Sequence, residues 1–446
     1  MKNILIIGAG RSATTLIAYL LKQAKKHEWN VIVADADLSL AEEKVAGCDR
    51  AQAVVLDIFN VEARRALLNK VEVVVSMLPA FLHVEVAKDC VTYGKHLMTA
   101  SYVSEEMAKL GDQARAKGLI FMGEIGLDPG LDHMSAMEKI DEIKERGGKL
   151  SSFRSYTGGL IAPESDTNPW HYKFTWNPRN VILAGQGTAQ YLENNKLKFI
   201  PYNQLFKNHS TTEIDGMGTY ELYANRDSLA YREIYGLQDI PNIFRGTLRN
   251  TGFCRAWDAF IKMDWTDDTF IIKDAANLTY RELTEAYTPS GNWSLESRVA
   301  QLIGEEPDSE VMKKLEWAGI FSDEKIKVAN ASPAKILEHL LLDKWKLSPT
   351  DKDMVIMKHE FEYTLDGQEK LLTSTLVMKG DDQVNTAMAK TVGLPLGIFV
   401  KLVMEEKITS TPTSVPVVKK IYQPVLAELK EHGIEFIERL MVKNRV

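Results

Sequence analysis

The sequence predicts an α/β protein built on a doubly wound parallel sheet, with an inserted α+β domain and a helical subdomain. Two observations predict this architecture. Short apolar runs alternate with segments of helical periodicity over the first 122 residues, which is typical of the strands and covering helices of a parallel sheet. After residue 148 this alternation stops, and extended segments are followed by helices. The length of 446 residues allows about three domains.

The first element is a strand over residues 4–7, because four consecutive apolar residues suit a strand covered on both faces. A glycine-rich turn follows, and apolar residues then recur at helical spacing up to residue 24. In a Rossmann fold, glycines at such positions permit a tight turn and a close approach of the backbone to a pyrophosphate. We prefer this interpretation to an empty strand–helix turn. The predicted cofactor contacts in the turn are Gly8, Gly10, Arg11, Ser12 and Ala13.

Asp35 ends the second predicted strand, residues 31–34, and bears on the choice of cofactor. A carboxylate at this place can accept hydrogen bonds from the adenosine ribose and would repel a 2′-phosphate. No Arg or Lys lies within residues 34–41, so we expect NAD rather than NADP. Asp37 is a rival for this role, and either acid could simply be solvated in a loop. Asp57, which ends the third strand, is expected near the adenine.

The alternation of strands and helices continues to residue 122. Ligands of such sheets bind beyond the carboxyl ends of the strands, and Leu78 and Ser101–Tyr102 fall there. Ser104 has the residue type and the position of a helix N-cap. Further strands are expected over 53–56, 71–77, 96–100 and 119–122, and helices over 61–68, 81–93 and 104–117.

The segment Glu124–His133 ends the sixth strand and begins a helix. Asp128 followed by Pro129 is typical of an N-cap and a first helical residue. Asp128 could also position an amine or relay a proton at the nicotinamide end of the site, and the two roles are compatible. His133 is expected to be a structural histidine, and Gly147–Gly148 is expected to end the helix.

Residues 149–265 predict an α+β arrangement. The loop over 161–178 is rich in Pro and Trp, and its Trp176 could line a ligand site or pack in a core. Arg226 and Arg249 could bind a multiply anionic substrate through their guanidinium groups, or could form structural salt bridges. Strands are expected over 149–156, 198–201, 220–227 and 245–249.

The remaining residues predict helices and one hairpin. The hairpin is expected around Asp366–Gly367, a dipeptide typical of a tight turn. Its strands are expected over 355–365 and 371–379, and helices over 280–286, 295–302, 311–317, 333–343, 385–402 and 417–432.

Composition argues against several classes of function. Lys and Arg total 54 and Asp and Glu total 61, so the net charge of −7 argues against nucleic acid or an anionic membrane surface as a partner. No apolar run reaches the roughly 18 residues that cross a bilayer, and no N-terminal signal segment is evident. The three cysteines and nine histidines are scattered, so we expect free thiols, no structural metal and a cytoplasmic location.

The chain resembles the saccharopine dehydrogenases that form L-glutamate, also called saccharopine reductases. It looks closest to the NAD-using form within bifunctional aminoadipic semialdehyde synthase. The resemblance spans nearly the whole chain, and residues 126–133 and 245–249 carry its most specific motifs. The other matching segments are Gly8–Gly10, Ser101–Tyr102, Ser155–Tyr156, Gly158–Gly159, Ala162–Glu164, Asn168–Pro169, Tyr172–Phe174, Asn225–Ser228 and Ala387–Pro395.

The resemblance implies that saccharopine is oxidised to L-glutamate and 2-aminoadipate 6-semialdehyde in lysine metabolism, or formed by the reverse reductive condensation. It implies Tyr102 and Asp128 as acid–base candidates, and a homodimer formed through the α+β domain. The implied substrate contacts are Ser101, Tyr102, Arg226, Thr247, Leu248 and Arg249. The implied cofactor contacts are the 8–13 turn, Leu78, Leu127, Asp128, Pro129 and Trp176.

The resemblance also implies three domains. These are a nucleotide-binding domain (1–127 plus about 385–446), an α+β substrate and dimerisation domain (128–265 and about 350–384) and a helical insert (266–349).

The chain departs from the family pattern at three positions. Relatives usually carry Cys where Thr157 stands, and Pro where Ile161 and Ala224 stand. A threonine hydroxyl is no acid–base catalyst near neutral pH, so we infer a supporting role for Thr157. These departures leave room for an oxidoreductase acting on another imine or C–N bond, such as a carboxynorspermidine-type dehydrogenase. A further alternative is a non-catalytic NAD-binding sensor.

Overall fold

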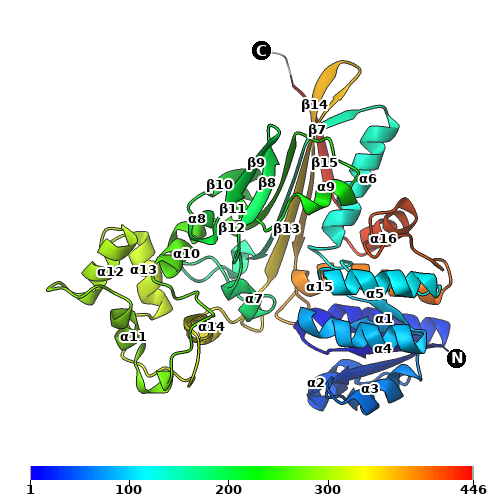
Figure 1. Cartoon of the computed structure of the whole chain (residues 1–446), viewed down its shortest axis with the longest axis horizontal. Coiled ribbons are helices and arrows are strands. Elements are labelled where there is room, and N and C mark those ends of the chain that lie inside the picture. The colour runs from blue at the N-terminus through cyan, green and yellow to red at the C-terminus, as the bar shows by residue number, and fades with distance from the viewer. Residues whose placement is uncertain (1, 444–446) are drawn as a thin grey trace. The chain divides into compact units, whose positions relative to one another are not determined.

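The computed structural model describes residues 2–443, and these residues form two compact units (Figure 1). Unit 1 comprises the residues up to 149 together with 364–368 and 380–437. Unit 2 comprises residues 150–363, 369–379 and those from 438 onward. The helical segment 266–349 belongs to unit 2, and the division into three domains stays a sequence-based prediction beside this division into two units.

Unit 1 is built on a six-stranded parallel sheet with the strand order β3-β2-β1-β4-β5-β6. This is the order of the dinucleotide-binding doubly wound fold, so the predicted fold class is confirmed. Its central strands are apolar because helices bury both faces. The strands are β1 (Asn3–Ile7), β2 (Asn30–Asp35), β3 (Ala51–Val55), β4 (Val73–Ser76), β5 (His96–Met98) and β6 (Phe121–Met122).

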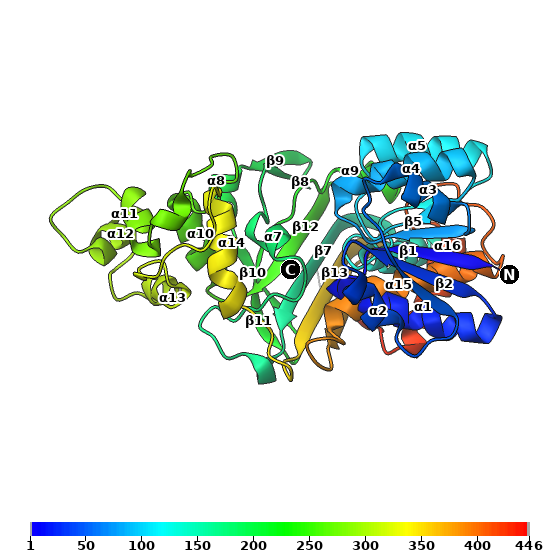
Figure 2. The same cartoon turned by 90° about the horizontal axis from the view of Figure 1, so that it is seen from below.

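The helices of unit 1 are α1 (Thr14–His27), α2 (Leu38–Val45), α3 (Val61–Leu68), α4 (His83–Tyr93), α5 (Glu105–Ala116), α6 (Leu131–Glu145), α15 (Ala387–Met404) and α16 (Lys419–Glu431). Figure 2 shows α3, α4 and α5 on one face of the parallel sheet and α1, α2 and α15 on the other. Ser104 caps α5 as predicted, because its hydroxyl accepts a hydrogen bond from the Met107 N–H at 3.2 Å. Helix α2 was not predicted from the sequence.

Helix α15 lies against α1, although the two are far apart in the sequence (Figure 1). A Cβ at Gly393 would lie 2.7 Å from the backbone nitrogen of Leu16, so a glycine is needed for this close packing. The helix has 18 residues and a mean hydropathy of 1.5, so it is long and apolar enough to cross a membrane. The expectation that no such segment exists is therefore wrong. However, 83% of the helix is buried inside the structure, as in the core helix of a globular fold.

Unit 2 contains a mixed sheet in the order β10-β11-β12-β7-β13-β14-β15, and β8 pairs with both β12 and β9. The predicted hairpin turn is confirmed, because Asp366 and Gly367 both have positive φ, 53° and 74°, between β13 and β14. The strands are β7 (Lys149–Ile161), β8 (Ala189–Glu193), β9 (Lys196–Ile200), β10 (Ser210–Ile214), β11 (Gly218–Ala224), β12 (Asn242–Asn250), β13 (Asp353–Leu365), β14 (Gln368–Lys379) and β15 (Ile437–Val442).

The helical part of unit 2 encloses an aromatic core. Trp170 stacks on Phe260 with ring centroids 5.5 Å apart, and Trp345 meets Tyr172 edge-on at 5.0 Å. The loop over 161–178 therefore contributes three buried aromatic side chains to this core, those of Trp170, Tyr172 and Phe174. The helices are α7 (Pro178–Ile182), α8 (Tyr202–Leu205), α9 (Ala230–Ile234), α10 (Phe253–Lys262), α11 (Tyr280–Ala286), α12 (Leu295–Ile303), α13 (Glu310–Ala318) and α14 (Pro333–Lys344).

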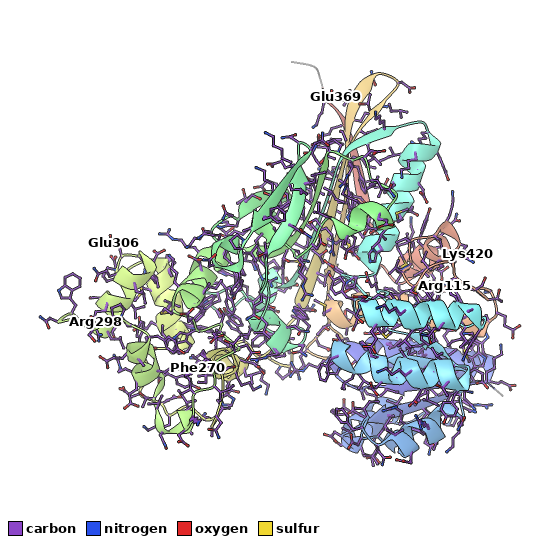
Figure 3. The ribbon with its side chains drawn as sticks, in the orientation of Figure 1. Arg115, Phe270, Arg298, Glu306, Glu369 and Lys420 are labelled. Atoms are coloured by element: carbon purple, nitrogen blue, oxygen red, sulfur yellow. The ribbon has the colours of Figure 1, made fainter. Side chains whose placement is uncertain are left out.

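Charged side chains of both signs cover the surface, and Figure 3 labels the exposed Glu306, Glu369 and Lys420. Many of the charges form ion pairs, such as Lys419 with Glu145 at 2.6 Å. Exposed pairs of this kind contribute about 0–1 kcal/mol each to folding stability. The apolar cores therefore dominate the stability of both units.

Candidate active site

The glycine-rich turn between β1 and α1 has the geometry of a nucleotide-binding turn. Gly8 has a φ of +106°, and a Cβ there would lie 3.0 Å from the Met77 carbonyl oxygen, so a side chain would be strained. The Gly8 N–H donates to the Ala34 carbonyl at 2.8 Å and holds the turn against β2. Residues 11–13 form a 3-10 turn before α1, in which Arg11 is exposed and Ala13 is buried. The first N–H groups of a helix lack intrahelical partners and bind phosphates well.

The Asp35 carboxylate is hydrogen-bonded to the backbone of this turn. Its Oδ2 accepts a hydrogen bond from the Ala9 N–H at 2.7 Å, and its Oδ1 accepts one from the Asp37 N–H at 3.0 Å. The carboxylate therefore braces the glycine-rich turn against the loop after β2. The ribose contact of Asp35 stays a prediction.

The two other acids near the nucleotide end have local roles. Asp37 caps α2, and hydrogen bonds from the Ser39 hydroxyl and N–H hold the pKa of Asp37 below its usual value. Asp57 Oδ1 accepts from the Phe59 N–H at 3.0 Å in the turn before α3. The adenine contact of Asp57 also stays a prediction. The cofactor contact of Leu78, which packs partly buried beside the sheet, likewise stays a prediction.

A buried histidine that the sequence did not predict as a site residue lies beyond the carboxyl ends of β4 and β5. His83 Nδ1 lies 2.8 Å from Ser76 Oγ, and Nε2 lies 2.8 Å from Ser101 Oγ and 3.2 Å from Thr99 Oγ1. Burial lowers the pKa of His83 to about 4, so the ring is neutral at neutral pH. A signal in the sequence was available, because His83 follows the end of the fourth strand by only a few residues.

Tyr102 and Asp128, the two predicted acid–base candidates, lie together. The Tyr102 hydroxyl donates a hydrogen bond to Asp128 Oδ1 at 3.1 Å. Tyr102 is 36% exposed, and Asp128 is partly exposed, so a ligand can reach the pair from solvent. A hydroxyl bonded to a carboxylate can pass a proton to or from a bound substrate. The catalytic roles of the two residues stay predictions.

Asp128 does not cap the following helix, so that prediction is wrong. Helix α6 begins at Leu131 with Gly130 as its N-cap, and the peptide bond between Asp128 and Pro129 is cis. Asp132 Oδ1 instead accepts from the Gly130 N–H at 2.6 Å. The Asp128 carboxylate is therefore available to Tyr102.

The neighbours of Asp128 in this loop are buried. Leu127 is 5% exposed and Pro129 is also buried. The Gly126 N–H donates to the Pro129 carbonyl at 3.0 Å and closes the loop. The cofactor contacts of this segment stay predictions.

Glu124 and His133 hold the loop that carries Tyr102. Glu124 Oε2 lies 2.7 Å from His133 Nε2, and Glu124 Oε1 accepts from the Val103 N–H at 2.9 Å. Both side chains are buried. His133 is thus part of a structural pair, as expected, and the pair fixes the backbone directly after Tyr102.

In unit 2, two predicted substrate residues, Thr247 and Arg249, lie on one face of the mixed sheet. Thr157 of β7 lies opposite Thr247 of β12 in the register, and Thr247 lies opposite Tyr223 of β11. Arg249 follows Thr247 by two residues and so points to the same face. The Thr157 hydroxyl is buried and has no hydrogen-bond partner among the described residues. Thr157, one of the three positions at which the chain departs from its relatives, therefore lies next to Thr247, a predicted substrate contact.

Arg249 is a buried guanidinium among aromatic rings. It is 4% exposed, and its guanidinium carbon lies 5.3 Å from the ring centroids of Tyr172 and Phe253 and 5.8 Å from that of Tyr223. Within residues 2–443 no carboxylate forms an ion pair with it, and its Nε has no partner. A structural salt bridge is therefore not its role. A buried unpaired cation is costly, and a bound anion would relieve that cost.

The other predicted residues of unit 2 are placed as follows. Arg226 has a φ of 46°, and its carbonyl accepts from the Gln190 N–H at 2.8 Å. Leu248 is fully buried and belongs to a hydrophobic core cluster. Trp176 is partly buried and packs against the aromatic core. The substrate and cofactor contacts of these residues stay predictions.

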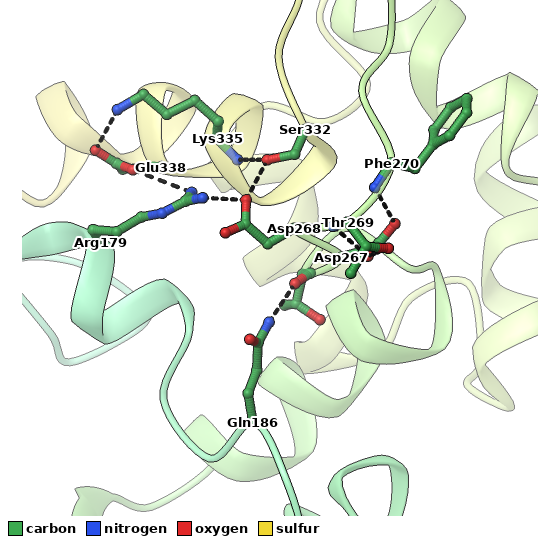
Figure 4. Close-up of polar contacts among 10 residues, drawn as sticks. Arg179, Gln186, Asp267, Asp268, Thr269, Phe270, Ser332, Lys335 and Glu338 are labelled. Carbon is green, nitrogen blue, oxygen red and sulfur yellow. Dashed lines mark hydrogen bonds and ion pairs between the residues drawn. The ribbon is translucent and has the colours of Figure 1, made fainter. Parts of the chain in front are cut away.

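A cavity of about 920 Å³ lies elsewhere in unit 2. Figure 4 shows the polar contacts beside it, in which Arg179 pairs with Asp268 and Glu338. The Ser332 hydroxyl donates to Asp268 at 2.6 Å. These contacts join α7 to α14. No predicted site residue lines the cavity, whose walls include Gln186, Tyr202, Asp267, Phe270 and Tyr287.

Two family models match the chain. The saccharopine dehydrogenase NADP binding domain matches residues 4–122, and the saccharopine dehydrogenase C-terminal domain matches residues 126–434. The chain is 32% identical over 451 residues to the saccharopine dehydrogenase [NADP(+), L-glutamate-forming] of Schizosaccharomyces pombe, with 99% of both chains covered. It is also 32% identical to the alpha-aminoadipic semialdehyde synthase of Arabidopsis thaliana, of whose length it spans 45%.

Solved structures agree with this result. The apo saccharopine dehydrogenase (L-Glu forming) from Saccharomyces cerevisiae superimposes with a TM-score of 0.87 at 30% identity, covering 99% of this chain and 100% of that one. The homospermidine synthase of Legionella pneumophila, solved in complex with NAD, gives a TM-score of 0.56 at 10% identity, a likeness in fold alone. The family resemblance is therefore confirmed.

The expected preference for NAD over NADP is contradicted. The model that matches residues 4–122 describes an NADP binding domain, and the relatives from Schizosaccharomyces pombe, Pyricularia oryzae and Saccharomyces cerevisiae are named for NADP(+). The inference relied on Asp35 as a free acceptor for the ribose, whereas two backbone N–H groups already bind its carboxylate. These two hydrogen bonds to the backbone explain an acid at this position without a contact to the ribose. The chain belongs to the saccharopine dehydrogenase family.

Proposed function

We propose that this protein interconverts saccharopine with L-glutamate and 2-aminoadipate 6-semialdehyde, using the NADP(H) for which its relatives are named. The observation that carries the proposal is the hydrogen bond between Tyr102 and Asp128 beyond the strand ends of a dinucleotide-binding sheet. The full-length similarity to enzymes named for this reaction supports it.

The reaction requires a hydride transfer and several proton transfers. In the oxidative direction, saccharopine, NADP⁺ and water give glutamate, the semialdehyde, NADPH and a proton. A nucleotide held by the glycine-rich turn around Gly8 would supply the hydride acceptor, and loss of a hydride from the carbon beside the secondary amine would convert the substrate into an imine. Water adds to the imine carbon, and the C–N bond then breaks as the amine nitrogen takes up a proton.

Asp128 and Tyr102 are the groups that we assign to the proton transfers. The Asp128 carboxylate can accept a proton from the amine or from the attacking water. The Tyr102 hydroxyl, which donates to Asp128 in this structure, can donate to the departing nitrogen instead. The Glu124–His133 pair holds the Tyr102 loop in place during these steps.

The environment of Arg249 favours a substrate that carries several carboxylates. Saccharopine carries three of them, and a buried guanidinium with no carboxylate partner among the described residues suits one of these groups. The surrounding rings of Tyr172, Tyr223 and Phe253 exclude water and strengthen such a contact.

A second candidate is the oxidation of a different secondary amine. The observation that favours it is the Thr157 hydroxyl, which is buried beside Thr247 and has no hydrogen-bond partner among the described residues. A substrate that offers this hydroxyl a polar partner would be preferred over one that does not. No specific observation favours a non-catalytic sensor.

The test is an assay of the purified protein with saccharopine and NADP⁺, following the absorbance of the reduced nicotinamide. Mass spectrometry would identify glutamate among the products, and parallel reactions would replace the nucleotide with NAD⁺ or saccharopine with carboxylated polyamines. Turnover of another amine without turnover of saccharopine would overturn the proposal. We also propose a homodimer and a cytoplasmic location, for which sedimentation and cell fractionation are the tests.

A further inference from the structure

The cavity beside Asp268 in unit 2 is separate from the candidate active site. Its volume is about 920 Å³, which is within the range of small-molecule sites in proteins. None of the residues predicted to bind the substrate or the nucleotide lines it. Figure 4 shows the polar contacts that hold one part of its wall, the segment 264–269 that follows α10. The proposed mechanism makes no use of this cavity.

The polar side chains that line the cavity are rich in hydrogen-bond acceptors and include no cation. Among its described lining residues there is no Lys, Arg or His, whereas three are aspartates. Arg179 pairs with Asp268, but Asp264 and Asp267 form no ion pair within residues 2–443. The lining therefore carries an excess of negative charge.

The Asp264 and Asp267 carboxylates are held differently. Asp267 accepts hydrogen bonds from the Thr269 N–H at 2.8 Å and from the Thr269 hydroxyl at 2.7 Å. Burial raises the pKa of Asp267, but these hydrogen bonds outweigh burial and bring the pKa below its usual value. Asp264 is exposed, and its carboxylate has no hydrogen-bond partner among the described residues. Burial, together with the charges of Asp267 and Asp264, raises the pKa of Tyr287, so the field of both carboxylates reaches this ring.

Two neutral groups of the lining offer further acceptor atoms. The Gln186 amide nitrogen donates to the Thr266 carbonyl at 2.9 Å, so the amide oxygen is left for another donor (Figure 4). The Tyr202 hydroxyl is buried and meets no partner at hydrogen-bonding geometry within residues 2–443. Burial raises the pKa of Tyr202 to about 12, so this hydroxyl stays neutral. A ligand group that only donates hydrogen bonds matches such a lining, and an ammonium group is one.

Aromatic and aliphatic side chains form the rest of the lining. Phe270 is 60% exposed although it borders the cavity, and Tyr202 and Tyr287 supply two further rings. Aromatic rings attract cations through their faces and also cover apolar groups. The aliphatic residues of the lining are Ile261, Ile272, Leu278, Leu283 and Ala286.

We propose that this cavity binds an organic cation, an ammonium group carried on a short apolar chain. The acidic segment 264–269 takes the ammonium group, and the aliphatic residues cover the chain. Hydrogen bonds from an ammonium group to carboxylates are stronger than those between neutral groups, and removal of the chain from water adds to the affinity. The site shares no residue with the candidate active site, so its ligand is independent of the proposed function.

Three ligands of equal chain length test which charge the cavity selects. At neutral pH hexylamine is a cation, hexan-1-ol is neutral and hexanoate is an anion. Ligand-observed NMR titrations of the full chain, without nucleotide or saccharopine, would give the three dissociation constants. We expect hexylamine to bind about tenfold or more tightly than hexan-1-ol, and hexanoate to bind more weakly than either. Equal affinities for the amine and the alcohol would overturn the proposal.

Asp264→Asn tests where the amine binds. Asp264 is exposed and has a φ of 55°, which Asn also adopts, so the fold should be retained. We expect the affinity for hexylamine to fall about fivefold or more, with the affinity for hexan-1-ol unchanged. Asp366→Asn is the matched control, because Asp366 is exposed, has a φ of 53° and does not line the cavity. Equal affinities of the two variants for hexylamine would refute the assignment.

A pair of substitutions at Ala286, the exposed last residue of α11, tests the sign of the charge at one position. Ala286→Lys brings a cation into the lining and should abolish the binding of hexylamine, whereas Ala286→Glu should retain or strengthen it. Equal binding in both variants would contradict the proposal. Excess saccharopine should leave hexylamine bound, because no predicted substrate contact lines the cavity. Displacement by saccharopine would place the amine in the active site instead and overturn the proposal.

Discussion

The Tyr102 hydroxyl donates a hydrogen bond to Asp128 Oδ1 at 3.1 Å, although 26 positions separate the two residues in the sequence. Tyr102 follows β5, and Asp128 lies in the loop after β6, which is the neighbouring strand in the parallel sheet. Parallel strands end at the same edge of a sheet, so their following loops meet. The contact is possible because Asp128 lies outside helix α6.

Asp128→Asn should lower kcat for saccharopine oxidation by about 10²-fold to 10⁴-fold, because an amide cannot accept the proton. Tyr102→Phe should lower kcat less, since it removes the donor and leaves the carboxylate. Steady-state kinetics at saturating nucleotide would measure both effects. The exposed Asp49 provides a matched control for the loss of one carboxylate. A kcat for Asp128→Asn equal to that of Asp49→Asn would remove Asp128 from the mechanism.

Arg249→Met should weaken saccharopine binding without lowering the melting temperature. The apolar stem stays among the aromatic rings, and a buried cation without a carboxylate is no source of stability. We expect KM to rise by about tenfold or more, with the affinity for nucleotide unchanged. Arg255→Met is the control, because Arg255 is exposed and pairs with Glu305 at 2.6 Å. A melting temperature that falls while KM stays constant would show that Arg249 is structural.

Thr157→Val should raise the stability of the protein without ligand. The substitution keeps the shape and removes a buried hydroxyl that has no partner among the described residues, a group whose burial costs about 1–3 kcal/mol. Urea unfolding would measure the change. If the hydroxyl also contacts the substrate, kcat/KM should fall in the same variant, and Thr157→Ser should restore it. A loss of stability in Thr157→Val would mean that the hydroxyl has a partner in the native state.

Acid should destabilise unit 1 through His83. Its pKa is about 4 in the folded protein and lies near the ordinary 6.5 when unfolded, so between these values the unfolded chain binds the extra proton. The contribution of His83 is therefore present above about pH 6.5 and is lost as the pH falls toward 4, by at most about 3 kcal/mol. Urea midpoints of the wild type and His83→Gln, compared from pH 7 to pH 4, would measure this. The difference should narrow or reverse in acid, and parallel curves would contradict the prediction.

Local patterns were sufficient for much of the fold. Helices α3 and α11 have the predicted bounds, and Ser104 is the predicted cap, because apolar periodicity and capping act between residues a few positions apart. The alternation of strands and helices likewise predicted the sheet of unit 1. Helix α10 was missed although one of its faces is strongly apolar, because the neighbouring segments were interpreted as connectors of strands. Strand β15 was missed because all six of its residues are exposed, so it lacks an alternation of buried and exposed positions.

The sequence by itself determined the glycine-rich turn and the strand–helix alternation of unit 1 apart from α2, and its family resemblance pointed to Tyr102 and Asp128. The tertiary structure alone decided that the Asp35 carboxylate is hydrogen-bonded to the Ala9 N–H and that His83 is hydrogen-bonded to Ser101. It also decided that Arg249 is buried without a carboxylate partner among the described residues. The physical reason is the range of the interactions. Capping and periodicity depend on near neighbours, whereas burial and the pairing of polar groups depend on which distant segments the fold brings into contact.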